Sequence, residues 1–196
     1  MIDKSKMTRA DFVQLINERD YKTVIEVGVG YGGYSQWLVS QCPNIVLYAV
    51  DPFEVPAEAG FKPGGFESTL KRLDPWLRTG FDPRGIRAYI CPVSSVEAAK
   101  AVEDKTVDFI YIDGDHSYEA VKADLEAWLP KMRPGGFLSG HDYFASRQPH
   151  VVRAVDEFRL NHSWLEFGIT VIDPTQPGDA HGEEFDAPSW WFEIPK

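Results

Sequence analysis

The stretch that decides the fold runs from Thr23 to Gly33 and reads TVIEVGVGYGG. It opens with an apolar run rich in β-branched residues, which is the pattern of a strand buried on both faces of a parallel sheet. It ends in glycines, and a helix is predicted directly after them, over residues 33–41. This arrangement brings backbone N–H groups close to a nucleotide-like ligand, and glycine permits the approach because it has no Cβ.

The glycines of this stretch fit more than one pattern. Gly28, Gly30 and Gly33 match G-x-G-x-x-G, which is the dinucleotide-binding pattern. Read with Glu26, the glycines at 28, 30 and 32 match E-x-G-x-G-x-G, which resembles motif I of class I S-adenosylmethionine methyltransferases. A tight turn that binds no ligand is the third interpretation.

Length and charge narrow the class of protein. A chain of 196 residues, 43% hydrophobic and 26% charged, is most simply one α/β domain. The net charge of −10 would repel a phosphate backbone, so nucleic acid is disfavoured as a substrate. We find no apolar run long enough to span a membrane and no signal peptide, so we expect a cytoplasmic protein without a membrane partner. The cysteines, Cys42 and Cys91, fit a reducing compartment.

The rest of the chain predicts the remainder of a Rossmann-like fold. We expect further strands at 45–50, 86–90, 107–112, 137–140, 167–172 and 189–194. Helices are expected at 8–19, 66–78, after Ser94, from Ser117 to about 131, and at 148–160. Because no helix separates the last two strands, they must pair antiparallel. The predicted fold is α/β, a seven-stranded and mostly parallel sheet with helices on both faces and an antiparallel C-terminal hairpin.

Polar residues stand where several predicted strands end. Asp51 lies 23 residues after Gly28, near the spacing at which nucleotide-binding folds place an acid on the ribose hydroxyls. The segment Asp113-Gly114-Asp115-His116 follows the fourth strand, and His141-Asp142 follows the fifth. Because parallel strands finish at the same edge of a sheet, these side chains should converge where open α/β sheets bind ligands.

Asp113, His141 and Asp142 form a donor set that suits a divalent cation. Two carboxylates favour Mg²⁺, Ca²⁺ or Mn²⁺, whereas an imidazole moves the balance toward Mn²⁺, Fe²⁺ or Zn²⁺. His116 could reach the same cavity as a general base, since an unperturbed histidine has a pKa of about 6.5. The alternatives are an Asp-Gly turn and structural histidines. Likewise, Ser94 and Ser95 stand where this fold approaches an adenine, or serve only to cap a helix.

Taken together, these motifs resemble class I methyltransferases, and more narrowly methyltransferase family 24, which includes metal-dependent sugar O-methyltransferases of macrolide and aminocoumarin biosynthesis. The resemblance covers about residues 20 to 195. It implies that the cofactor is S-adenosylmethionine and that a divalent cation, Mg²⁺ or Mn²⁺, assists. The departure is His141, where the sugar methyltransferases carry a second aspartate. The residues to which the resemblance assigns roles are Glu26, Gly28, Gly30 and Gly32 for the methionine and ribose parts of the cofactor, Asp51 for the ribose, Ser94 and Ser95 for the adenine, Asp113 beside the cofactor and as a metal ligand with His141 and Asp142, and His116 or Asp115 as the base.

The function that follows is O-methylation of a small-molecule hydroxyl of sugar or natural-product type. We expect one methyltransferase domain over residues 1–196, with an N-terminal helix in 1–20 and the catalytic core in 21–196. A homo-oligomer is left open. The competing hypotheses are a nicotinamide-dependent oxidoreductase, a non-catalytic protein that binds S-adenosylmethionine, and a methyltransferase that acts on a small amine.

Overall fold

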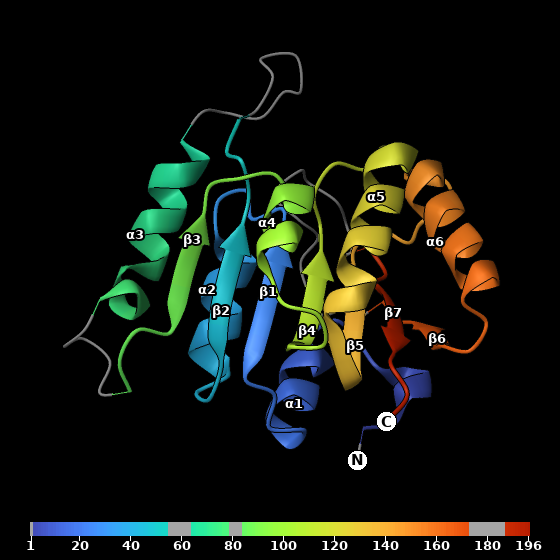
Figure 1. Ribbon diagram of the computed structural model, residues 1–196, viewed down its shortest axis with the longest axis horizontal. Helices are drawn as coiled ribbons and strands as arrows, with labels where there is room; N and C mark the ends of the chain where they lie inside the picture. Colours follow the sequence, from blue (N-terminus) through green and yellow to red (C-terminus); the bar gives the residue numbers. More distant parts are fainter. Residues whose placement is uncertain (1, 55–63, 79–83, 173–186) are drawn as a thin grey trace.

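The computed structural model describes residues 2–54, 64–78, 84–172 and 187–196. These residues form one seven-stranded sheet with helices packed against it (Figure 1). The strands are β1 (Thr23–Val27), β2 (Val46–Val50), β3 (Ala88–Cys91), β4 (Val107–Ile112), β5 (Met132–Gly140), β6 (Glu166–Ile169) and β7 (Trp190–Glu193). The helices are α1 (Asp11–Glu18), α2 (Gly33–Gln41), α3 (Gly65–Leu77), α4 (Ser95–Ala101), α5 (Tyr118–Trp128) and α6 (Pro149–Asn161), with short 3₁₀ turns at Lys4–Lys6 and Leu129–Lys131.

The order of the strands across the sheet is β3-β2-β1-β4-β5-β7-β6. The first five strands are parallel to one another, whereas β7 pairs antiparallel with both β5 and β6. The predicted fold class is therefore confirmed, including the antiparallel pair at the C-terminal end of the chain. The carboxyl ends of β1, β2 and β4 lie together at the upper edge of the sheet (Figure 1).

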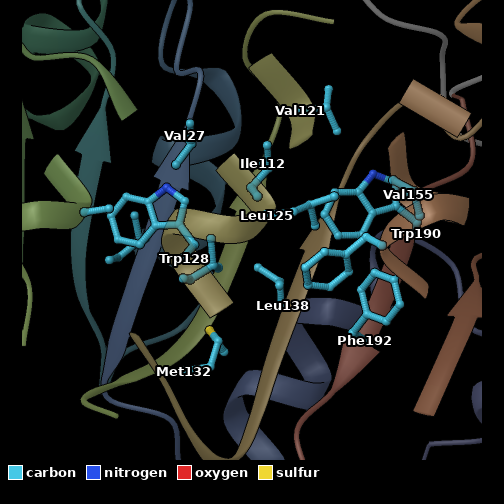
Figure 2. Packing of buried hydrophobic residues seen from close by; sticks show 14 of the residues in the cluster. Val27, Ile112, Val121, Leu125, Trp128, Met132, Leu138, Val155, Trp190 and Phe192 are labelled. Carbon is cyan, nitrogen blue, oxygen red and sulfur yellow. The ribbon is translucent and has the colours of Figure 1, made fainter. Parts of the chain in front are cut away.

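One face of the sheet is covered by α4, α5 and α6. Their apolar side chains, including Val121, Leu125 and Trp128 of α5, pack against β4, β5 and β7 in a single buried cluster (Figure 2). Trp128 and Trp190 are almost completely buried in this cluster. Burial of apolar surface on this scale is the dominant favourable contribution to folding.

The other face is covered by α1, α2 and α3. Phe12 of α1 is fully buried and lies edge-on to the rings of Phe109, Tyr111 and Phe137. Because both faces are covered, every residue of β4 is buried. This burial on both sides explains the apolar run of β4 from Phe109 to Ile112.

The structure differs from the sequence-based expectation mainly at the ends of elements. The strand β5 begins at Met132, earlier than expected, because Met132 already pairs with Val107 of β4, and residues 133–136 fall in the irregularity in register that follows. The strand β6 ends at Ile169, earlier than expected. Ser94 is the N-cap residue of α4, but its side chain makes no capping hydrogen bond, so the alternative in which its hydroxyl caps the helix is not confirmed. The loops expected at 54–66 and 173–188 lie mostly outside the described residues.

None of the helices in the described ranges is long and apolar enough to cross a membrane.

Candidate active site

The glycine loop after β1 lies against the loop after β4. Gly28 has a φ of +82°, and a Cβ at this position would collide with the backbone of Asp113. Gly32 also has a positive φ, and a Cβ there would lie 2.9 Å from the Cα of Thr69 in α3. Gly30 differs, because it has a φ of +56° but, among the residues that the structure describes and beyond its two chain neighbours, no atom lies within 4 Å of where its Cβ would be. Contacts within the protein thus account for two of the glycines, and Gly30 borders open space.

Asp51 ties the end of β2 to this loop. One oxygen of its carboxylate accepts hydrogen bonds from the backbone N–H groups of Val29 and Gly30, at 2.8 and 2.9 Å. The other oxygen accepts from the N–H of Phe53 at 2.6 Å. A carboxylate has about four acceptor sites, so one is left for a ligand hydroxyl. Asp51 therefore shapes the loop itself, and its binding of a ribose stays a prediction.

Glu26 lies beneath the glycine loop, not on its surface. Its side chain is 2% exposed and accepts a hydrogen bond from the hydroxyl of Ser35, which joins β1 to α2. Burial raises the pKa of the Glu26 carboxyl to about 8, with the negative charge of Asp113 acting in the same direction. Its contact with a cofactor stays a prediction.

The residues expected after β4 and β5 do come together. His116 Nε2 lies 3.1 Å from Asp142 Oδ2 and 3.6 Å from Asp113 Oδ1. Asp142 has a φ of +60°, in the left-handed region that is uncommon outside glycine but in which aspartate is among the better tolerated residues. Burial alone would raise the pKa of Asp113, but the imidazoles of His141 and His116 outweigh it and hold that pKa well below its usual range.

His141 occupies the inner side of the same cluster and is only 5% exposed. Its Nδ1 faces the two carboxylates, 3.6 Å from Asp113 Oδ1 and 3.5 Å from Asp142 Oδ1. One donor atom each from Asp113, His141 and Asp142 can be chosen so that all three lie within 4.8 Å of one another. The predicted convergence at the carboxyl edge is therefore present.

These groups line a small hollow that has a polar wall and an apolar wall. The polar wall comes from the loops after β4 and β5, and the apolar wall comes from α5, α6 and the hairpin. The lining residues are Ile112, Asp113, Gly114, Asp115, His116, Val121, His141, Val151 and Trp190.

The remaining predicted site residues are Asp115, Ser94 and Ser95. Asp115 is exposed, and its carboxylate accepts a hydrogen bond from the N–H of Ser117 at the start of α5. The hydroxyl of Ser95 accepts from the indole N–H of Trp128 at 2.8 Å and bonds to Asp124, so the protein itself uses it. Ser94 is exposed beside it.

Two residues at this edge were missed by the sequence reasoning. Arg9, from the turn before α1, has its Nη1 3.2 Å from His141 Nε2. Gln148, the N-cap residue of α6, has its Nε2 3.0 Å from His116 Nδ1. The topology did contain a signal for Arg9. The helix α1 leads directly into β1 and runs in the opposite direction, so the residues at its start lie toward the carboxyl end of β1.

Comparison with known proteins agrees with this architecture. A model of a family of methyltransferase domains, methyltransferase family 24, matches residues 25–143, which is well over half of the chain. The chain belongs to this methyltransferase family. Its fold is that of the class I S-adenosylmethionine-dependent methyltransferases: an O-methyltransferase of Bacillus cereus, solved with S-adenosylhomocysteine, superposes with a TM-score of 0.62 over 96% of this chain and 82% of that one, at 14% identity.

Two curated relatives match part of this chain. An uncharacterized protein of Sinorhizobium fredii, y4gI, is 29% identical over 124 residues, which is 62% of this chain but 13% of that protein. An uncharacterized protein of Acanthamoeba polyphaga mimivirus, R132, is 27% identical over 145 residues, or 71% of this chain and 60% of that protein. The methyltransferase chain thus spans only part of the length of both relatives.

The buried Glu26 predicts a pH dependence of stability. Its pKa is about 8 when folded and about 4.5 when unfolded, so the folded state binds more protons between these values. This carboxyl therefore lowers the free energy of unfolding as pH rises from about 5 to about 8. We expect Glu26→Gln, measured by urea unfolding, to gain stability relative to wild type across that window. Parallel pH profiles for the two proteins would contradict this.

Gly28 and Gly30 have different surroundings, so replacing them should cause different defects in stability and in cofactor binding. Gly28→Ala should destabilise the fold strongly, because its Cβ would collide with Asp113. Gly30→Ala should cost only about 1–2 kcal/mol, from its left-handed backbone, yet weaken S-adenosylhomocysteine binding about tenfold or more by filling the open space. Urea unfolding measures the loss of stability, and calorimetric titration measures the binding of S-adenosylhomocysteine. Gly30→Ala protein that binds like wild type would show that the space does not receive the cofactor.

Proposed function

We propose that this chain is an S-adenosylmethionine-dependent methyltransferase that methylates a hydroxyl of a small molecule, of sugar or natural-product type. The observation that carries the proposal is a histidine, His116, held between two carboxylates at the edge where the glycine loop ends. A hydroxyl becomes a good nucleophile when it gives up its proton, and a positioned imidazole can accept that proton. A neutral amine needs no such partner.

The site is built to hold and stabilise that proton. The nearby carboxylate of Asp113 raises the pKa of His116, with the charge of Asp142 acting in the same direction. Nε2 of His116 faces the carboxylates and carries its hydrogen toward them, so the lone pair of the neutral ring is on Nδ1. The side-chain amide of Gln148 can turn either its N–H or its carbonyl toward Nδ1, so both the neutral ring and the imidazolium can be satisfied. His116 would take the proton at Nδ1, and Asp142 would stabilise the imidazolium.

When bound, S-adenosylmethionine would supply a methyl carbon on a positively charged sulfur, which keeps the bonding electrons once the acceptor oxygen takes the methyl group. The open space at Gly30 and the remaining acceptor site of Asp51 support binding at this edge. Because the methyl group is already activated, the contribution of the protein is mainly alignment, which in favourable cases is worth about 7–11 kcal/mol.

Metal assistance is a second form of the proposal, and two features of the site bear on it differently. The spacing of Asp113, His141 and Asp142 supports it, since their donor atoms can lie within 4.8 Å of one another. The position of the hydrogen on His141 does not suit metal binding, because Nε2 of His141 faces the guanidinium of Arg9. We therefore derive no catalytic step through a metal.

The competing hypotheses are less well supported. The halves of a nicotinamide-binding domain repeat βαβ, whereas here β7 is antiparallel. A non-catalytic binding protein would have no need of the cluster around His116. The unidentified acceptor leaves methylation of an amine as the alternative to be tested.

A turnover assay tests the role of His116. We would measure S-adenosylhomocysteine formation with a panel of sugars, polyols and phenols, and with amines for comparison. His116→Asn should slow turnover of the hydroxyl acceptors by about 10²–10⁴-fold while still binding S-adenosylhomocysteine. His150→Asn, an exposed histidine in the first turn of α6, should behave like wild type. Turnover of amines only, or a His116→Asn variant as fast as wild type, would overturn the proposal.

A further inference from the structure

Arg9 reaches the inner side of the carboxyl edge from the turn before α1. It is half-buried, and its guanidinium lies over the ring of Tyr34, 5.1 Å from the ring centre. Its Nη1 is 3.2 Å from Nε2 of His141, which is itself buried. This contact joins the N-terminal segment to the site, across 132 residues of sequence.

The chemistry of this contact determines where His141 carries its proton. A guanidinium has only donors and stays charged at any ordinary pH, so the nitrogen that faces it must accept. With a lone pair on Nε2, the neutral imidazole carries its hydrogen on Nδ1. That N–H points at the carboxylates of Asp113 and Asp142.

This arrangement is the reverse of what a metal ligand needs. A histidine that binds a metal through one nitrogen almost always donates the hydrogen of the other to a carboxylate, a carbonyl or water. For Nδ1 of His141 to bind a cation beside Asp113 and Asp142, Nε2 would have to bear a hydrogen aimed at Arg9. Two donors would then face each other.

We propose that Arg9 is a positioning residue that holds His141 as a hydrogen donor to Asp113 and Asp142, and so replaces a divalent cation at this place in the site. The contact of Arg9 with Nε2 and the binding of a metal to Nδ1 exclude each other. The importance of this inference for catalysis rests on the proposed methyltransferase function, but its test does not.

His116 offers an internal comparison. Nδ1 of His116, which faces away from the carboxylates, also lies beside a side-chain donor. That donor is the amide of Gln148, which can rotate and present its carbonyl instead. His116 can therefore gain and lose a proton on Nδ1, as a base must, whereas Nε2 of His141 cannot while Arg9 stays in place. The two outer partners give the two histidines different roles.

Metal titration of three proteins tests the proposal. Chelator-treated wild type, Arg9→Gln and Arg9→Lys would each be titrated with Mn²⁺ by calorimetry. A glutamine can accept a hydrogen bond from Nε2–H, so Arg9→Gln should bind Mn²⁺ about 10–100-fold more tightly, the usual effect of a partner of a ligating histidine. Arg9→Lys keeps a donor and should bind as weakly as wild type. Arg78→Gln removes an exposed arginine directly after α3 and should also match wild type.

Nitrogen-15 NMR of the histidine rings gives a reading that needs no variant. In the wild type, His141 should show a protonated Nδ1 and an unprotonated Nε2. A protonated Nε2 with a bare Nδ1, equal Mn²⁺ affinities for wild type and Arg9→Gln, or tight Mn²⁺ binding by wild type that His141→Ala abolishes, would each overturn the proposal. S-adenosylhomocysteine titration of the same samples shows separately whether the proposed function fails.

Discussion

The contact on which this structure depends is the one between Gly28 and the backbone of Asp113. The two segments pass so closely that any Cβ at Gly28 would collide. The N–H of Asp113 also donates to the carbonyl of Val27 at 2.7 Å, and the N–H of Gly28 to that of Val50 at 2.9 Å. These bonds fix the loops after β1, β2 and β4 against one another, and the chemical groups of the site stand on those loops.

The sequence was informative wherever burial dictates the pattern. The strands β1 and β4 are covered on both faces, so their apolar runs predicted both their place and their direction. The convergence of Asp113, His141 and Asp142 followed from the rule that parallel strands end at one edge. The start of β5 was not predictable in the same way, because glycine and proline favour a turn and only pairing with β4 extends the strand to Met132.

Local sequence patterns did not predict the residues whose role depends on a single long-range contact. No local pattern sets Arg9 apart from other arginines, since its partner lies 132 residues away. The hydrogen bond from Trp128 to the hydroxyl of Ser95 is likewise set by tertiary packing, and the binding of an adenine by Ser95 stays a prediction. Buried carboxyl groups follow a common logic here, because a carboxyl removed from water either keeps its proton, as Glu26 does, or gains neighbouring N–H donors, as Asp113 does from His116 and His141.

The central claim is that the carboxyl edge of the sheet binds S-adenosylmethionine. The most direct test is calorimetric titration of the chelator-treated protein with S-adenosylhomocysteine, repeated on Asp51→Ala. We expect one site with a dissociation constant in the micromolar range, and we expect the substitution to abolish the binding. The absence of binding by the wild-type protein, or binding unchanged in Asp51→Ala, would contradict the account.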